Sequence, residues 1–285
     1  MKIFLIISSV MVATLADQCH YGQTSSKPQS LVTCKSIPVD ALGKNMKLMG
    51  KTGPFDSVHD LELTNFTGKL DANSLSMFPN LQRLVIQDSN FAKLDATVFS
   101  KCCKNLKKLS IRNNPQTVIE PASFKDLNHL EELHINNKIN KLSKAFLQGM
   151  PAIKKLTLRR TKISEIDENA FEDVKNLDSL EIYDNDFPSV KPKTFAPLKE
   201  LKKISILDNA LLKTFPLDLL KEQKKLELLG LPAEILSKLD ASALKKQMPT
   251  LKKIEVKVDD KKKYETFFKK VTDQGIIVNY IGAYF

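Results

Sequence analysis

A short apolar pattern recurs along most of the chain at intervals of 23 to 25 residues. Leucine, isoleucine or valine occupies its first, fourth and sixth positions. The nine matches start at Val58, Leu81, Leu106, Leu130, Ile153, Leu177, Leu201, Leu226 and Leu251. A fixed period of this length indicates a solenoid, because each unit buries its apolar face only against its neighbours. The pattern therefore predicts one elongated domain, although 285 residues would suggest two on length alone.

A second landmark lies late in five of the units. It is a phenylalanine, at Phe99, Phe124, Phe146, Phe171 and Phe195. Over residues 58–258 the two motifs together resemble the leucine-rich repeat of the typical extracellular class. The resemblance implies an α/β leucine-rich repeat solenoid, a horseshoe with short parallel strands on its concave face. Its phenylalanine column would lie on the convex side, as core.

The same family usually carries asparagine at the ninth position of each repeat. Asn114, Asn185 and Asn209 comply, whereas Ser89, Lys138 and Thr161 do not. The repeat that starts at Leu130 is also about one residue short. We therefore expect an incomplete asparagine ladder and less regular turns.

The N-terminus predicts a secretory signal peptide over residues 1–16. Lys2 is a short basic region, residues 3–15 are mostly apolar, and Ala16 ends a small-residue cleavage site. The expected protein is secreted and extracellular. No later apolar stretch reaches the ~18 residues of a transmembrane anchor.

Caps are expected at both ends of the solenoid. In the N-terminal cap, residues 17–57, the oxidising compartment and the spacing favour a Cys19–Cys34 disulfide. The family's usual cap has four cysteines, so this one resembles a reduced version. In the C-terminal cap, residues 259–285, we expect a helix over 261–271 and a strand over 276–280 that pairs with the last repeat.

Two further features carry open alternatives. Cys102 occupies a slot that leucine or valine fills in other repeats, and Cys103 beside it is expected to be exposed. The pair is compatible with a vicinal disulfide, with free thiols, or with an intermolecular bridge through Cys103 to a disulfide-linked oligomer. The triplet at Asn65 is a sequon, which predicts a glycosylation site.

The formal net charge of +11 arises from 44 basic and 33 acidic residues, but only four of the basic residues are arginine. Because bidentate recognition of phosphates and bases favours arginine, the charge does not indicate nucleic-acid binding. At the second and third repeat positions, lysine pairs alternate with mostly acidic pairs. Adjacent parallel strands would place opposite charges about 4.8 Å apart, which predicts inter-strand ion pairs that fix register.

The outward positions 5, 7 and 8 do not alternate in this way. They include Ser110, Asn113, Asn137, Thr157, Glu181, Asp184, Ser205, Leu207 and Asp208. Three of the four arginines gather at these positions, and Arg, Tyr and Asn are typical of protein-recognition surfaces. The candidate ligand-binding residues are Arg112, His134, Asn136, Arg159, Arg160 and Tyr183. The alternative interpretation is an ordinary solvated sheet face.

Enzymatic function is not indicated. The four histidines are scattered, and the chain has no zinc-protease motif, nucleophile elbow or phosphate-binding glycine loop. No cofactor or metal is expected.

As a whole the chain resembles a truncated Toll-type receptor ectodomain, or the secreted repeat proteins of invertebrate immunity. The resemblance implies a soluble binder of an extracellular protein: a recognition factor, or a decoy in Toll-type signalling. One alternative is an accessory or structural subunit of a secreted complex. Another is a binder of anionic glycan or lipid surfaces through Lys245, Lys246, Lys261, Lys262 and Lys263.

Overall fold

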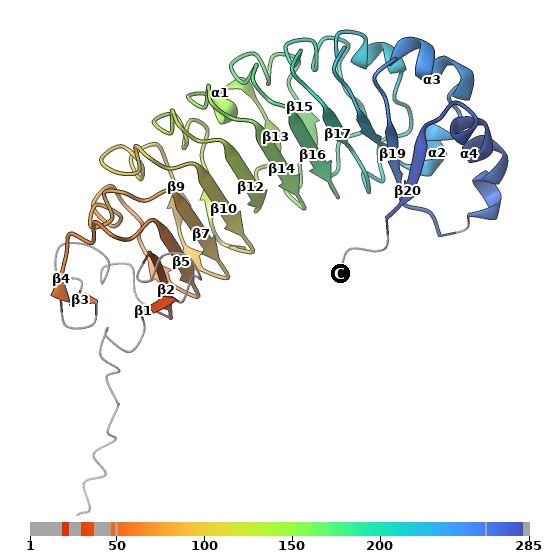
Figure 1. Cartoon of the computed structure of the whole chain (residues 1–285). Helices are drawn as coiled ribbons and strands as arrows, with labels where there is room; N and C mark the ends of the chain where they lie inside the picture. The colour runs from red at the N-terminus through yellow and green to blue at the C-terminus, as the bar shows by residue number, and fades with distance from the viewer. Residues whose placement is uncertain (1–18, 23–29, 37–46, 49–50, 260, 282–285) are drawn as a thin grey trace, which may run out of the picture.

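The protein folds as an arch with its long sheet along the inner side and turns along the outer side (Figure 1). The structure is a computed structural model, which describes residues 19–22, 30–36, 47–48, 51–259 and 261–281. The predicted signal peptide, residues 1–16, lies outside the described residues. The twelve strands of the long sheet, in spatial order, are β1 (Cys19–Gly22), β2 (Leu31–Lys35), β5 (Asp60–Thr64), β7 (Arg83–Gln87), β10 (Lys108–Arg112), β12 (Glu132–Asn136), β14 (Lys155–Arg159), β16 (Ser179–Tyr183), β17 (Lys203–Ser205), β18 (Leu228–Gly230), β19 (Lys253–Val256) and β20 (Ile277–Tyr280).

The remaining elements are short and connect these strands. Four strand pairs are β3 (Lys47–Leu48) with β4 (Lys51–Thr52), β6 (Thr67–Gly68) with β8 (Asn90–Phe91), β9 (Lys93–Leu94) with β11 (Val118–Ile119), and β13 (Lys141–Leu142) with β15 (Glu165–Ile166). The helices are α1 (Lys144–Leu147), the 3-10 turn η3 (Leu217–Leu220), α2 (Ala233–Leu236), α3 (Ala241–Gln247), the 3-10 turn η4 (Lys262–Tyr264) and α4 (Glu265–Thr272).

Each of the nine apolar pattern matches contains one strand of the long sheet, from β5 to β19, and these strands are parallel. In β16, Leu180 and Ile182 are buried, whereas Ser179, Glu181 and Tyr183 are half-buried on the concave face. This period of two is what a strand with one buried face requires. The predicted leucine-rich repeat solenoid is confirmed.

The phenylalanine column packs along the core as predicted. All five of its members are buried. Phe124 makes ring contacts with both Phe99 and Phe146, at centroid distances of 6.4 and 5.6 Å, and Phe171 contacts Phe195 at 5.8 Å. Each contact joins consecutive repeats, so the aromatic column contributes to the interfaces between units.

A buried polar ladder continues through the positions where we expected gaps. Ser89 donates its backbone N–H to Asn114 Oδ1 at 2.9 Å, and the Thr161 N–H and hydroxyl both donate to Asn185 Oδ1, at 3.0 and 2.8 Å. In the short repeat the ladder residue is Asn137 rather than Lys138, and Asn137 hydrogen-bonds Asn114. The expectation of an incomplete ladder was therefore wrong, because small hydroxyl side chains and a shift of one residue satisfy the same backbone groups.

The N-terminal cap contains the predicted Cys19–Cys34 disulfide. It joins β1 and β2, which pair antiparallel, and β2 then pairs parallel with β5 of the first repeat. The cap thereby covers the edge of the repeat sheet.

Cys102 and Cys103 form the vicinal disulfide, and Cys103 is buried, contrary to its predicted exposure. Cys103 has a φ of 66°, and its carbonyl accepts the N–H of Leu106 at 3.0 Å. This turn brings Cys103 into the core before the next strand. Of the three alternatives, the structure favours neither free thiols nor a bridge to a second chain.

The cysteine pairing predicts a simple labelling result. In denaturant without reductant, iodoacetamide should modify none of the four cysteines, and after reduction it should modify all four. Mass spectrometry of the labelled protein measures this directly. A labelled thiol before reduction, or a dimer that disappears on reduction in a denaturing gel, would contradict the pairing.

The C-terminal cap contains the expected helix and strand with small shifts. The predicted helix over 261–271 begins as the 3-10 turn η4 and continues as α4, which buries Phe268 and Val271. The predicted strand over 276–280 is β20, which pairs parallel with β19. This cap lies beside the last repeats at the end of the arch opposite β1 (Figure 1).

Candidate functional site

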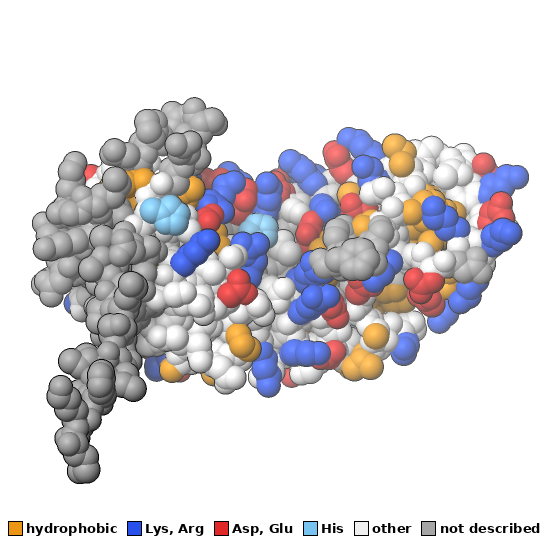
Figure 2. Space-filling view, turned by 90° about the horizontal axis from the view of Figure 1, so that it is seen from below, with side chains coloured by type: hydrophobic (Ala, Val, Ile, Leu, Met, Phe, Trp, Pro, Cys, Tyr) orange, Lys and Arg blue, Asp and Glu red, His pale blue; other side chains and the backbone are white. Residues whose placement is uncertain are grey.

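The concave face carries rows of opposite charges between neighbouring strands, as the alternating pairs predicted. The carboxylate of Glu132 on β12 lies 3.2 Å from both Lys108 on β10 and Lys155 on β14. Lys154 pairs with Glu131 at 3.0 Å, and Lys252 pairs with Glu227 at 2.9 Å. Seen from below, basic and acidic side chains are interspersed along the arch (Figure 2). These exposed pairs neutralise much of the lysine charge locally.

The two carboxylates of this region titrate accordingly. Partial burial acts to raise the pKa of Glu132, but hydrogen bonds from Lys155 and Lys108 outweigh it and lower the pKa. The hydrogen bond from Lys154 lowers the pKa of Glu131. Both carboxylates are therefore ionised at neutral pH.

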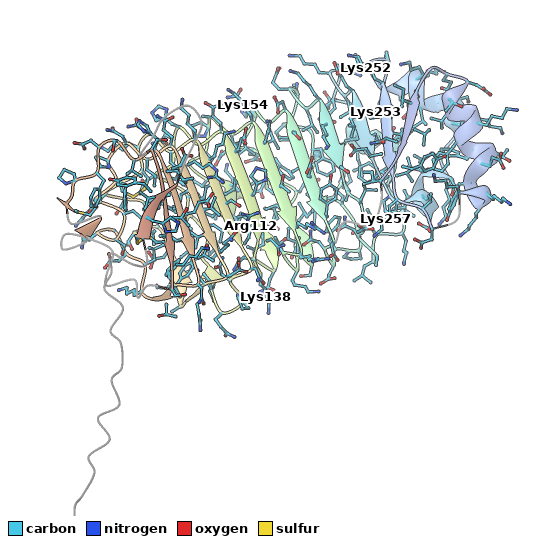
Figure 3. All side chains as sticks on the ribbon, turned by 60° about the horizontal axis from the view of Figure 1, so that its bottom comes forward. Arg112, Lys138, Lys154, Lys252, Lys253 and Lys257 are labelled. Atoms are coloured by element: carbon cyan, nitrogen blue, oxygen red, sulfur yellow. A yellow bond between two sulfur atoms is a disulfide. The ribbon has the colours of Figure 1, made fainter. Side chains whose placement is uncertain are left out.

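The six candidate binding residues fall into two groups. Arg112, His134 and Asn136 lie on β10 and β12 in the N-terminal half of the arch, and we call them the β10–β12 group. Arg159, Arg160 and Tyr183 lie at the ends of β14 and β16 and line a pocket, and we call them the pocket group. Figure 3 shows Arg112 well separated from Lys257, another pocket residue, along the same edge of the sheet.

The β10–β12 group forms a polar surface without a hollow among the cavities of the described residues. Arg112 donates to the side chain of Gln87 at 2.8 Å. Burial lowers the pKa of His134, against the opposing effect of Glu132 and Glu181, so the imidazole is neutral at pH 7. Its Nε2 lies 4.0 Å from Glu132.

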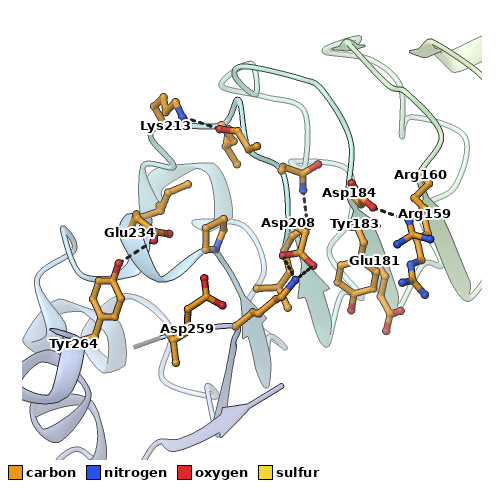
Figure 4. Close-up of a pocket in the computed structure, with 18 of the residues that line it drawn as sticks. Arg159, Arg160, Glu181, Tyr183, Asp184, Asp208, Lys213, Glu234, Asp259 and Tyr264 are labelled. Atoms are coloured by element: carbon orange, nitrogen blue, oxygen red, sulfur yellow. Dashed lines mark hydrogen bonds and ion pairs between the residues drawn. The ribbon is translucent and has the colours of Figure 1, made fainter. Parts of the chain in front are cut away.

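The pocket group opens onto a hollow of about 980 Å³ between the repeats and the C-terminal cap (Figure 4). One wall is formed by the ends of β14 and β16, and the other by α2, η4 and the segment after β19. The hollow arises where the repeat geometry changes. β17 and β18 are three residues long, against five in β16, and Pro232 then starts α2. The chain therefore leaves the sheet early and curves over its edge.

Three of the outward positions predicted on the concave face are buried. Ser205, Leu207 and Asn137 are at most 4% exposed. Asn137 belongs to the polar ladder. Leu207 follows the early end of β17, so the alternation of the strand no longer sets its direction. A Cβ at Gly230 would overlap Ser205 Oγ, which shows that Ser205 packs directly against β18.

Polar contacts tie the two walls of the pocket together. Lys257, after β19, lies 3.1 Å from Asp208, after β17. The Tyr264 hydroxyl of η4 donates to Glu234 of α2 at 2.9 Å, and Arg160 Nε donates to Asp184 at 2.8 Å (Figure 4). These contacts hold the charged lining in place around the hollow.

A buried charge cluster lies beside the pocket. Lys203 Nζ is 2.6 Å from Glu181 and 3.7 Å from Glu255. Glu255 is 9% exposed, and its Oε2 has no hydrogen-bond partner among the described residues. Lys203 thus lies between two carboxylates, and Glu255 is behind the lining rather than part of it.

The sequence did not reveal the half of the pocket that the cap contributes. Glu234, Lys257 and Tyr264 were not candidates, since they lie outside the repeat positions that point to the concave face. One signal was present: the glycine at Gly230 and the proline at Pro232 interrupt the pattern of the eighth repeat. Such residues mark a departure from regular strand geometry.

The described residues contain no group of three or more His, Cys, Asp or Glu side chains that could hold a metal ion. Among their helices, none has the length and apolar character needed to cross a bilayer.

Comparison with solved structures finds repeat proteins of the same fold. A leucine-rich repeat protein of Leptospira interrogans is 23% identical, with a TM-score of 0.58, and the match covers 79% of this chain and 55% of that one. Toll from the Toll–Spätzle complex of Drosophila is 13% identical, with a TM-score of 0.54, over 74% of this chain and 29% of that one. TLR13 from a complex with single-stranded RNA is 19% identical, with a TM-score of 0.52, over 70% and 33%.

The chain spans little more than half the length of the first of these proteins and about a third of the other two. No curated protein sequence matches it. The profile described as "BspA type Leucine rich repeat region" matches in six copies, over residues 55–153, 92–227 and 143–272. These matches extend over well more than half of the chain, and with the repeat fold they show that the protein belongs to the BspA-type leucine-rich repeat family.

Proposed function

We propose that the protein is a non-enzymatic binding module that holds a protein partner in the pocket between its repeats and its C-terminal cap. The observation that carries this proposal is the meeting of Arg159, Arg160 and Tyr183 with cap residues around one hollow. Arginine and tyrosine are enriched at the centres of protein interfaces, where they combine apolar contact area with hydrogen bonding. Leucine-rich repeat proteins generally serve as interaction scaffolds, and the Toll structure is itself a complex with a protein, Spätzle.

The more specific form of the proposal is a secreted recognition factor or decoy for Toll-type signalling. It rests on the predicted signal peptide and on the resemblance to Toll-type ectodomains. Asn65 is exposed and its Nδ2 donates to Ser36 Oγ at 2.9 Å. Its side chain is accessible to glycosylation, which is part of the same proposal.

The two alternatives have weaker support. An accessory subunit linked through Cys103 conflicts with the buried vicinal disulfide. For an anionic surface binder, the five lysines are split between α3 and the region before α4. Lys261 and Lys263 lie over the rings of Tyr280 and Tyr264, at 4.5 and 4.9 Å. They do not form one continuous basic patch.

Selection from a random peptide library displayed on phage tests the binding module. We expect the wild type to enrich a family of peptides, and the double variant Arg159→Ala/Tyr183→Ala to lose at least about tenfold in affinity for them. The reason is that the pair removes an arginine and an aromatic anchor from the same wall. Biolayer interferometry with the synthetic peptides gives the affinities.

The control is Lys104→Ala/Lys138→Ala, two exposed lysines outside the pocket, which should leave affinity unchanged. A double variant of the β10–β12 group, Arg112→Ala/Asn136→Ala, locates the surface. If that variant abolishes binding and the pocket variant does not, the proposed site is wrong.

A further inference from the structure

The pocket lining has an excess of positive charge. It contains seven basic side chains and five acidic ones, a difference of two. Three of the acidic side chains form ion pairs within the lining: Glu181 with Lys203, Asp184 with Arg160, and Asp208 with Lys257. Their negative charge is therefore already matched, and the field of the hollow is set by the cations that remain in excess.

A fourth acidic side chain, Glu234, is also held by its surroundings. Its Oε1 accepts the Tyr264 hydroxyl, and Lys263 and Lys238 are close enough to act on its charge. Its own backbone N–H makes the largest contribution to lowering the pKa of Glu234, with Tyr264 and these lysines adding to it. Glu234 therefore stays ionised without offering a free carboxylate to a ligand.

The same lining has an apolar component. Leu207, Leu212, Pro232, Ile235 and Val258 contribute to it, and the rings of Tyr183 and Tyr264 lie on opposite walls. A volume of about 980 Å³ is at the upper end of the range for ligand pockets. It has room for several consecutive side chains rather than for a single small ion.

We infer that the pocket selects an acidic peptide segment, in which carboxylates alternate with apolar side chains, from the protein partner. This inference rests on the proposed function and names the chemistry that the binding module recognises. Carboxylates on the segment complement the basic excess, and its apolar side chains contact the leucine, isoleucine and tyrosine surfaces. Charge complementarity of this kind raises the association rate and selects between partners.

The test uses two blocked tetrapeptides that differ only in charge, acetyl-Leu-Asp-Leu-Asp-amide and acetyl-Leu-Asn-Leu-Asn-amide. We expect the aspartate peptide to bind at least about tenfold more tightly at low salt, and the preference to shrink as the Debye length falls from ~30 Å at 0.01 M to ~8 Å at 0.15 M. Calorimetry measures both affinities. Tyrosine fluorescence gives a second readout, because the chain has no tryptophan and two of its five tyrosines line the pocket.

A matched pair of lysine variants locates the effect. Lys213→Gln/Lys238→Gln makes the lining electrically neutral, and we expect it to reduce the aspartate preference to less than about threefold. Lys104→Gln/Lys138→Gln lowers the net charge of the protein by the same amount away from the pocket, so the preference should persist.

Each outcome decides between the two proposals. Equal binding of the two tetrapeptides, with tight binding of library peptides, would overturn the acidic specificity and leave the binding module standing. Tighter binding of neutral or basic library peptides would do the same. Failure of the library to yield any pocket-dependent peptide would instead remove the proposed function.

Discussion

Replacing Asn185 by leucine should lower the free energy of unfolding by about 4 kcal/mol, because the two side chains are similar in size but only asparagine serves the polar ladder. Asn185 is 2% exposed. Its Oδ1 accepts the N–H groups of Thr161 and Ile163 at 3.0 and 3.2 Å, and its Nδ2 donates to the carbonyls of Leu158 and Tyr183 at 3.2 and 2.8 Å. Four buried backbone groups would lose their partner, at roughly 1–3 kcal/mol each. Urea unfolding followed by circular dichroism measures the change.

The matched control is Asn176→Leu. Asn176 makes one side-chain hydrogen bond, to the Pro151 carbonyl at 2.9 Å, and it is exposed. Solvent replaces that bond when it is lost, so we expect a change below about 1 kcal/mol. If the two variants were equally stable, the ladder would contribute little to the interfaces between repeats.

Replacing Gly149 by alanine should destabilise the protein by more than about 3 kcal/mol. Gly149 has a φ of 83°, and a Cβ there would overlap the Cα, carbonyl carbon and carbonyl oxygen of Lys125 in the preceding repeat. Backbone atoms cannot rotate away as a side chain does, so the two repeats would have to separate. Thermal unfolding by calorimetry and the yield of folded protein report the effect.

Gly275→Ala separates this steric effect from backbone strain. Gly275 has a similar φ of 73°, but a Cβ there would meet nothing within 4 Å. Only the cost of a left-handed alanine remains, about 1 kcal/mol. A Gly149→Ala protein as stable as Gly275→Ala would show that neighbouring repeats tolerate separation.

The repeated part of the fold was predictable because each unit repeats the same physical solution. The apolar positions gave the strands, and the phenylalanine column gave the convex core. The polar ladder was missed at Ser89 and Asn137, because its requirement is a hydrogen-bonding group at one place in space. A hydroxyl, or an asparagine one residue earlier, meets that requirement as well as the usual asparagine does.

The pocket was half predictable for a related reason. Arg159, Arg160 and Tyr183 follow the repeat positions, so their shared edge could be inferred from sequence. Their neighbours across the hollow could not, since the Lys257–Asp208 contact joins residues 49 apart. No periodicity relates them. Their meeting depends on how far the cap curves back after Gly230.

The shared construction of the pocket couples ligand binding to folding at the C-terminal end of the arch. Terminal units of a solenoid have a neighbour on one side only, so they are where unfolding begins most easily. A ligand that touches both β14–β16 and the cap binds only while the last repeats are folded. By mass action it would stabilise them by RT ln(1 + [L]/Kd), about 2.7 kcal/mol at a hundredfold excess over Kd. Occupancy of the pocket and order in the last repeats are thus two measures of one equilibrium, and amide hydrogen exchange in β18 to β20 would report both.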